Sequence, residues 1–196
     1  MDSVVGEEGL FTDGDWILST DLQTGEDVRL LQLGDIGVGE FLDKSSKWIS
    51  RERHEELGCT EVRAGDILIS RMAEPIARAC RVPDLGCTCI TAVDVTICRI
   101  EDPRIDPDWV VLALNSPALR LAAEKLSSGT TRKRITRKKL ARLPVPVPPL
   151  DEQRRIVSYV RQYFVYIDGA GELLEAATSR LAALSPDRSS APGPDA

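Results

Sequence analysis

The pattern of apolar and polar positions changes along the chain, from short apolar runs in the first half to helical spacing in the second. Residues 28–33 (VRLLQL) and 67–70 (ILIS) are apolar runs with abrupt polar or glycine ends, which is typical of strands. Residues 92–100 (AVDVTICRI) alternate in character, and this run predicts a half-buried strand. Gly34 after the first run and residues 64–66 before the second predict turns.

Helix signals follow after residue 105. Asp106 and Ser116 each precede a proline suited to the first helical position, and both side chains can cap a new helix. We expect helices over 107–114 and 117–126, and a short third helix capped by Thr136.

A proline-rich segment and one long helix complete the pattern. Residues 143–149 (LPVPVPP) favour an extended, stiff connector. Residues 150–184 contain no proline and carry a heptad seam whose nine positions are all apolar or aromatic. These positions are Ile156, Val160, Tyr163, Ile167, Ala170, Leu174, Ala177, Leu181 and Leu184. The helix would be about 50 Å long, and Gly169 and Gly171 would each weaken it by about 1 kcal/mol.

Such a seam predicts pairing with a partner helix. The expected dimerisation residues are Ile156, Val160, Tyr163, Ile167, Leu174 and Leu181. Residues 185–196 include three prolines and no large apolar side chain, so we expect a disordered tail.

Length and composition limit what else the chain holds. Its 196 residues, 42% of them hydrophobic, suffice for the core of one domain, which we place at residues 1–149. The longest apolar run, 109–114, is far shorter than the roughly 20 residues of a membrane span. The first residues lack a basic region followed by an apolar one, so we expect a cytoplasmic protein.

The five cysteines show no paired CxxC spacing. Reduced thiols are therefore expected, with Cys87 and Cys89 as small core residues, and neither a disulfide framework nor structural zinc.

Charge is segregated along the chain. The formal net charge is −6, yet residues 1–58 contribute −9 (fourteen acidic, five basic) and residues 130–142 contribute +7 (seven basic, none acidic). Hydroxyl and cationic side chains interleave in 130–142, which suits phosphate contacts by Lys and Thr and bidentate contacts by Arg. A cationic patch on an acidic protein favours a selective polyanion site. We interpret the patch as a DNA or RNA contact, with a solvated helix face as the alternative.

The candidate contact residues in this segment are Thr130, Thr131, Arg132, Lys133, Arg134, Lys138 and Lys139.

Single residues elsewhere leave two readings open. Arg71, at a strand end, could reach a guanine edge or pair with a carboxylate such as Asp66 or Glu74. We expect Asp35 to cap a turn and His54, in a charged run, to be a solvated surface residue. The chain contains no glycine-rich phosphate loop and no HExxH motif, so we predict no catalytic residue, no cofactor and no metal site.

Five segments, in this order, resemble the specificity (S) subunits of type I restriction-modification systems, in particular a target recognition domain with its adjoining spacer helix. They are LLQLGDI (30–36), GDILISR (65–71), LALNS (112–116), GTT (129–131) followed by Ile135, and LPVPVPPLDEQRRIV (143–157). The last segment is the most specific, and the resemblance covers about residues 10–184.

The resemblance implies an α+β fold, with a curved, mostly antiparallel sheet and helices, followed by a long C-terminal coiled-coil helix that pairs antiparallel with its counterpart. It also implies a non-catalytic subunit that reads one half of a split double-stranded DNA site. The implied partners are a DNA methyltransferase subunit and a restriction or translocase subunit.

Within such a site, we expect a division of labour between phosphate and base contacts. The expected phosphate contacts are Lys133, Lys138 and Lys139. The expected base-edge contacts are Arg71, Thr131, Arg132 and Arg134.

Family members typically carry two recognition domains and two helices, and these 196 residues show one of each. We therefore expect either a homodimer through the C-terminal helix or service in a different assembly. One alternative function is a target-recognition module that guides another DNA-defence or DNA-modifying complex. Another is a helical scaffold that does not touch nucleic acid, which the net charge of −6 supports. A cryptic nuclease or methyltransferase is disfavoured because little chain remains for a cofactor domain.

Overall fold

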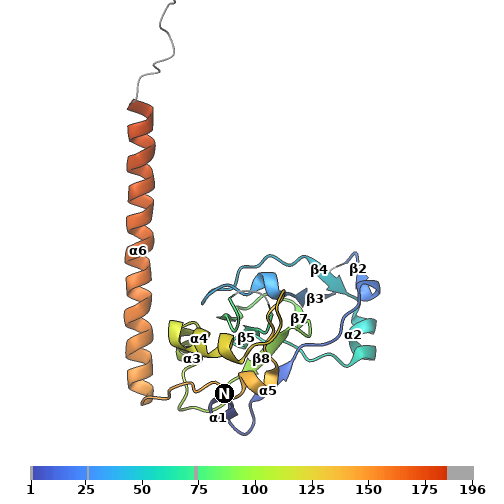
Figure 1. Ribbon diagram of the computed structural model, residues 1–196. Coiled ribbons are helices and arrows are strands. Elements are labelled where there is room, and N and C mark those ends of the chain that lie inside the picture. The colour runs from blue at the N-terminus through green and yellow to red at the C-terminus, as the bar shows by residue number, and fades with distance from the viewer. Residues whose placement is uncertain (1, 26, 73–74, 185–196) are drawn as a thin grey trace, which may run out of the picture. The chain divides into compact units, whose positions relative to one another are not determined.

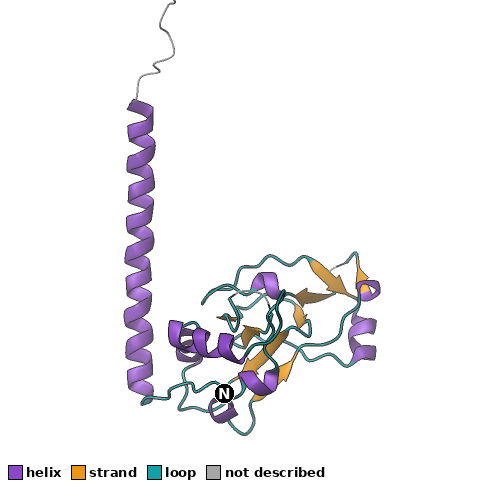
Figure 2. Ribbon diagram, viewed as in Figure 1, coloured by secondary structure: helices purple, strands orange, loops and turns teal. Residues whose placement is uncertain are grey.

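The computed structural model describes residues 2–25, 27–72 and 75–184, with the backbone alone at 2, 3, 168, 172 and 181–184. The chain divides into two units, Met1–Arg154 and Arg155–Ala196. The first unit holds two sheets and several short helices, and the second continues one long helix (Figures 1 and 2). The predicted disordered segment, 185–196, lies outside the described residues.

In the described ranges, eight short strands form two four-stranded sheets. The strands are β1 (Leu10–Asp13), β2 (Leu22–Gln23), β3 (Val28–Leu31), β4 (Lys47–Ile49), β5 (Ile67–Ser70), β6 (Ala79–Arg81), β7 (Thr88–Thr91) and β8 (Val95–Arg99). The sheet orders are β1-β8-β5-β6 and β2-β4-β3-β7. Every pairing is antiparallel except that of β3 with β7. The mostly antiparallel α+β class is confirmed, with two sheets where the resemblance implied one.

β8 corrects the prediction of a half-buried strand. Residues 93 and 94 belong to the turn that joins β7 to β8, so the strand begins later than expected. Thr96 and Cys98, which alternation assigned to the solvent side, are 0% exposed. β8 lies between β1 and β5, and the Thr96 hydroxyl donates to Asp13 Oδ1 at 3.1 Å, so this polar side chain is satisfied inside the protein.

The helices are α1 (Asp2–Val5), α2 (Arg51–Leu57), α3 (Pro107–Leu114), α4 (Pro117–Leu126), α5 (Arg137–Leu140) and α6 (Leu150–Leu184), with 3₁₀ turns η1 (Ser19–Asp21) and η2 (Leu33–Asp35). The predicted bounds of α3 and α4 are confirmed. Each of the three predicted caps, Asp106, Ser116 and Thr136, accepts a hydrogen bond from a backbone N–H of the first turn.

One side chain fixes the end of α3 to the sheet. Asn115 donates to the Ala79 carbonyl at 2.8 Å and accepts from the Ala79 N–H at 3.2 Å, as a neighbouring strand would. The asparagine of the LALNS segment therefore binds α3 to β6.

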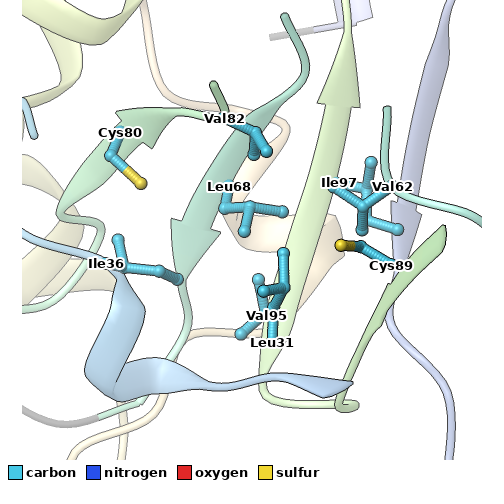
Figure 3. Packing of buried hydrophobic residues seen from close by; sticks show 9 residues of the cluster. All are labelled: Leu31, Ile36, Val62, Leu68, Cys80, Val82, Cys89, Val95 and Ile97. Atoms are coloured by element: carbon cyan, nitrogen blue, oxygen red, sulfur yellow. The ribbon is translucent and has the colours of Figure 1, made fainter. Parts of the chain in front are cut away.

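The main core lies between the two sheets, as Figure 3 shows. Its buried members are Leu31, Ile36, Val62, Leu68, Cys80, Val82, Cys89, Val95 and Ile97. Leu31 and Cys89 come from the second sheet, whereas Leu68 and Ile97 come from the first. Burial of these side chains joins the two sheets into one unit.

Side chains of the first unit also hold the proline-rich connector. Gln153, in the first turn of α6, is 0% exposed. Its amide donates to the Arg104 carbonyl at 3.0 Å, and its Oε1 accepts from the Asp106 N–H at 2.8 Å. Trp109 Nε1 donates to the Pro146 carbonyl at 2.8 Å. The most specific segment of the resemblance thus has a structural role, which is to mount the start of α6.

α6 is a single helix of 35 residues, as predicted. It continues through Gly169 and Gly171, the two expected weak points. Within the described ranges, no helix is long and apolar enough to cross a membrane.

Candidate functional site

The basic segment forms a loop between α4 and α5 that is closed at its base by the backbone. Ser128 and Arg134 exchange two N–H···O hydrogen bonds of 2.9 Å. Gly129 turns the chain with φ +106°, and a Cβ at this position would lie 2.6 Å from the Arg132 carbonyl oxygen. Both the backbone angle and the close approach require glycine. We call residues 129–133 the basic loop.

The exit of the basic loop is anchored in the fold. Ile135 is 0% exposed, and its N–H donates to the Arg71 carbonyl at 2.9 Å, which attaches the loop to the end of β5. α5 follows at once, with Thr136 as its cap and Leu140 fully buried. The loop therefore projects from a fixed base.

Four of the predicted contact residues are exposed: Thr130, Thr131, Arg132 and Lys138. Among the residues that the structure describes, Arg132 and Lys138 have no ion-pair or hydrogen-bond partner for their side chains. These two cations are directly available to an incoming anion.

Two cations of the basic segment form ion pairs at the surface. Lys133 pairs with Glu124 of α4, which lowers the pKa of the Glu124 carboxyl. Arg134 Nη2 lies 2.9 Å from Asp94 Oδ1 in the β7–β8 turn. The side chains of Lys133 and Arg134 remain 36% and 38% exposed, so each could still reach a ligand by leaving its partner.

The cations of α5 also contact neighbouring segments. Lys139 Nζ donates to the Leu126 carbonyl at 2.9 Å. Arg137 Nη1 donates to the Phe11 carbonyl at 2.8 Å, and its Nε lies 3.6 Å from Asp13 Oδ2. These hydrogen bonds and this ion pair attach α5 to the end of α4 and to β1.

Arg71 lies inside the protein, and not at the surface where base contact was expected. The residue is only 4% exposed, its Nε lies 3.2 Å from Asp13 Oδ1, and its guanidinium donates to the Val93 carbonyl. Burial lowers the pKa of Arg71, an effect that the Asp13 carboxylate opposes. Of the two open readings, pairing with a carboxylate matches the structure, with Asp13 as the partner. Of the two carboxylates named in advance, Asp66 binds Arg99 at 2.7 Å, and Glu74 lies outside the described residues.

The sequence analysis missed the acidic residues around the basic loop. Asp13, Asp94 and Glu124 come from three elements more than 100 residues apart at the extremes, so no local pattern groups them. Arg137 was also left out, although it belongs to the same charge run and was visible as part of it.

Two further single-residue predictions have different outcomes. Asp35 is confirmed as a turn cap, since it is 0% exposed and accepts from the backbone N–H groups of Gln32, Lys44 and Ser45 at 2.7 Å each. His54 is not a solvated residue. Its side chain is 15% exposed, with Nε2 4.0 Å from Glu61 Oε1.

The cysteines are all free thiols. Cys89, within β7, is buried as predicted. Cys87 precedes the first residue of β7 and is exposed, so the prediction of a core residue is wrong at this position. Burial raises the pKa of Cys80, Cys89 and Cys98 to about 12 each. In the described part of the chain, no group of three or more His, Cys, Asp or Glu side chains is placed to hold a metal ion.

The seam of α6 is an apolar surface. Tyr163, Ile167 and Leu174 are 51%, 62% and 70% exposed, whereas Ile156 and Val160 are half-buried. The side chain of the sixth expected dimerisation residue, Leu181, is outside the described part.

Aromatic rings mark the middle of this surface. The Tyr159 and Tyr163 hydroxyls are 2.8 Å apart and their ring centroids 4.7 Å apart. Together with Val160, Phe164 and Ile167 they line a shallow apolar hollow on the helix.

Comparison with known proteins finds similarity to the DNA specificity subunits of type I restriction systems. Residues 93–175, which span the basic loop, the connector and most of α6, match the model of the type I restriction modification DNA specificity domain. The specificity subunit of the Escherichia coli type I restriction enzyme EcoBI is 27% identical over 171 residues, which cover 82% of this chain and 34% of that subunit.

Solved structures show the same fold. A chain in a structure of a type I R-M system, solved to explain its assembly and conformational transition, is 25% identical with a TM-score of 0.61, over 87% of this chain and 40% of that one. The HsdS subunit from Thermoanaerobacter tengcongensis (23% identity, TM-score 0.59) matches over 82% of this chain and 36% of its own. The S subunit from M. genitalium (15% identity, TM-score 0.55) matches over 87% and 40%.

The resemblance to the specificity subunits of type I restriction-modification systems is confirmed, and residues 93–175 match the DNA specificity domain model of that family. The chain spans between a third and two fifths of the length of these relatives.

Proposed function

We propose that this chain is a non-catalytic, sequence-specific recognition subunit for double-stranded DNA in a type I-like restriction-modification system, and that it reads one half-site per chain. The observation that carries the proposal is the basic loop, which projects from a fixed base within the part of the chain that matches the DNA specificity domain. Seven cations in 130–142, in an otherwise acidic chain, suit a local contact with a polyanion.

The positions of the side chains suggest how the contacts divide. The exposed Arg132, Thr130 and Thr131 would meet the duplex first, with Lys138 on a neighbouring phosphate. Lys133, Arg134 and Lys139 would contribute after leaving their present partners. Arg71 would act indirectly, because its buried guanidinium and its carbonyl hold the segments beneath the loop.

Assembly would use α6. Its exposed seam, with Tyr163, Ile167 and Leu174, supports antiparallel pairing with a second copy of the chain, which would place two recognition units in inverted orientation. A DNA methyltransferase subunit and a restriction or translocase subunit would dock on this assembly in the cytoplasm. Light scattering tests the pairing: the expected mass is twice 21.5 kDa, and a monomer both alone and with the methyltransferase would contradict it.

The DNA proposal is tested by replacing Arg132, Lys133 and Arg134 together with Ala. Binding to duplex DNA, followed by fluorescence anisotropy over a salt series, should weaken strongly. The slope of log affinity against log salt should flatten by up to about 0.9 for each lost phosphate contact. The matched control replaces three exposed cations outside the segment, Lys47, Arg51 and Arg63, and removes the same charge.

Affinity and slope equal to those of the wild type in the first variant, with the fold intact, would overturn the assignment of the loop. Absence of salt-dependent binding by the wild type would favour a helical scaffold instead.

A further inference from the structure

Acidic side chains pair with two cations of the basic segment, Lys133 in the basic loop and Arg134 directly after it. Asp94, from the β7–β8 turn, faces Arg134, with 2.9 Å between Oδ1 and Nη2. Glu124, on α4, pairs with Lys133. Each partner comes from a different element, so these pairs are made by the fold and not by neighbours in sequence.

A third carboxylate nearby has a different role. Asp13 lies 3.2 Å from the Nε of the buried Arg71 and accepts from Thr96, so the fold needs this charge. Glu124 has no such tie, and Asp94 acts on the buried Arg71 through its charge, without a side-chain hydrogen bond to it in the described structure. The Glu124 side chain is 51% exposed, and Asp94 Oδ1, although close to Arg134, accepts no hydrogen bond in the described structure.

The chemistry of these two pairs imitates that of a nucleic acid. A carboxylate presents to an arginine or lysine the same anionic oxygens as a phosphate. Surface ion pairs contribute little to stability, so a duplex can displace them. Until it does, each carboxylate both occupies a cation and repels the phosphates of any approaching duplex.

We propose that Asp94 and Glu124 are specificity-determining residues, which keep Arg134 and Lys133 from binding DNA of arbitrary sequence. A non-matching duplex offers only phosphate contacts, and these must compete with the two carboxylates. A matching duplex adds base-edge contacts that favour the exchange. This inference rests on the proposed DNA-binding function.

The test uses Asp94→Asn and Glu124→Gln in the full chain, with binding to a duplex pool of random sequence. Freeing one cation for one phosphate should raise the affinity about 8-fold at 0.1 M salt, and should steepen the salt slope by about 0.9. Glu56→Gln is the matched control, since Glu56 is 55% exposed and pairs with Arg53 within α2 at 2.8 Å. It removes the same charge without freeing a cation of the loop.

The control variant, Glu56→Gln, should show neither the full gain in DNA affinity nor the steeper dependence of log affinity on log salt. Equal behaviour of all three variants, with the wild type binding DNA, would overturn this inference alone. A wild type that does not bind duplex DNA would overturn the proposed function as well. Glu124 lies on an exposed helix face, so Glu124→Gln keeps the test valid if Asp94→Asn lowers the thermal stability.

Discussion

The two units of the chain differ in how far their large apolar side chains are exposed to solvent. In the first unit, most large apolar residues of the sheets are buried and the rest are partly buried, and Ile67, Ile90 and Ile97 are 0% exposed. In α6, the five successive residues from Tyr163 to Ile167 are each more than half exposed. The first unit has its own core, whereas the middle of α6 exposes apolar side chains that the proposed partner would cover.

The exposed surface of α6 is also wider than a seam. Successive helical residues point about 100° apart, so the run from Tyr163 to Ile167 is apolar around the whole helix. Phe164, Val165 and Tyr166 lie outside the heptad positions, at 59%, 70% and 66% exposure. One paired helix would leave part of this surface open, which agrees with the proposed docking of a further subunit.

The largest expected effect comes from a matched pair of isoleucines. Ile97→Ala should lower the free energy of unfolding of the first unit by about 2–5 kcal/mol, because it leaves a cavity between the sheets. Ile167→Ala should leave that free energy unchanged within about 0.5 kcal/mol. Chemical denaturation followed by tryptophan fluorescence measures both, and equal losses would contradict the division into a self-sufficient unit and a partner-dependent helix.

A charge in the seam sharpens the comparison further. Ile167→Asp should raise the dimer dissociation constant at least about 100-fold, since pairing would bury an uncompensated carboxylate on each helix. Ser179→Asp is the control, because this exposed position lies opposite the seam in the heptad. Analytical ultracentrifugation across a concentration series distinguishes them, and an unchanged dimer in Ile167→Asp would exclude pairing through the seam.

Within the first unit, glycine substitutions test how rigidly the basic loop is held. Gly129→Ala should lower the unfolding free energy by about 1–3 kcal/mol and weaken DNA binding, because alanine is strained at φ +106° and its Cβ would meet the Arg132 carbonyl. Gly34→Ala, where a Cβ meets nothing within 4 Å, should change neither quantity appreciably. Wild-type DNA affinity in Gly129→Ala would show that the loop needs no fixed shape.

The smallest effect concerns the thiols. Alkylation of the native chain at pH 8 should modify Cys87 quickly and the other four cysteines slowly, because these are buried and burial raises the pKa of Cys59 to about 11. Mass spectrometry over time counts the added groups. Rapid labelling of several thiols would mean that the first unit opens readily.

The helical half of the fold was predictable because its signals are local. Asp106, Ser116 and Thr136 each stand directly before the helix they cap, and the absence of proline in 150–184 predicts one helix. The sheets were less predictable from the sequence than the helices. β1, β2 and β4 are only two to four residues long, and a short strand is defined by partners far away in sequence.

The same distinction applies to the candidate site. The basic loop was visible as a charge run with a glycine at its start, and its anchoring residues were not. Arg71 is buried because Asp13, 58 residues earlier, and the Val93 carbonyl meet it at the end of β5. A sequence shows that an arginine follows a strand, but not which carboxylate lies beside it.

The most direct test of the central claim is selection of duplexes from a random pool by the wild-type chain and by Ile167→Asp. The account predicts that the wild type enriches one short motif in two inverted copies at a fixed spacing, and that the variant enriches single copies of the same motif. Failure of the wild type to enrich any motif would contradict sequence-specific recognition by this chain.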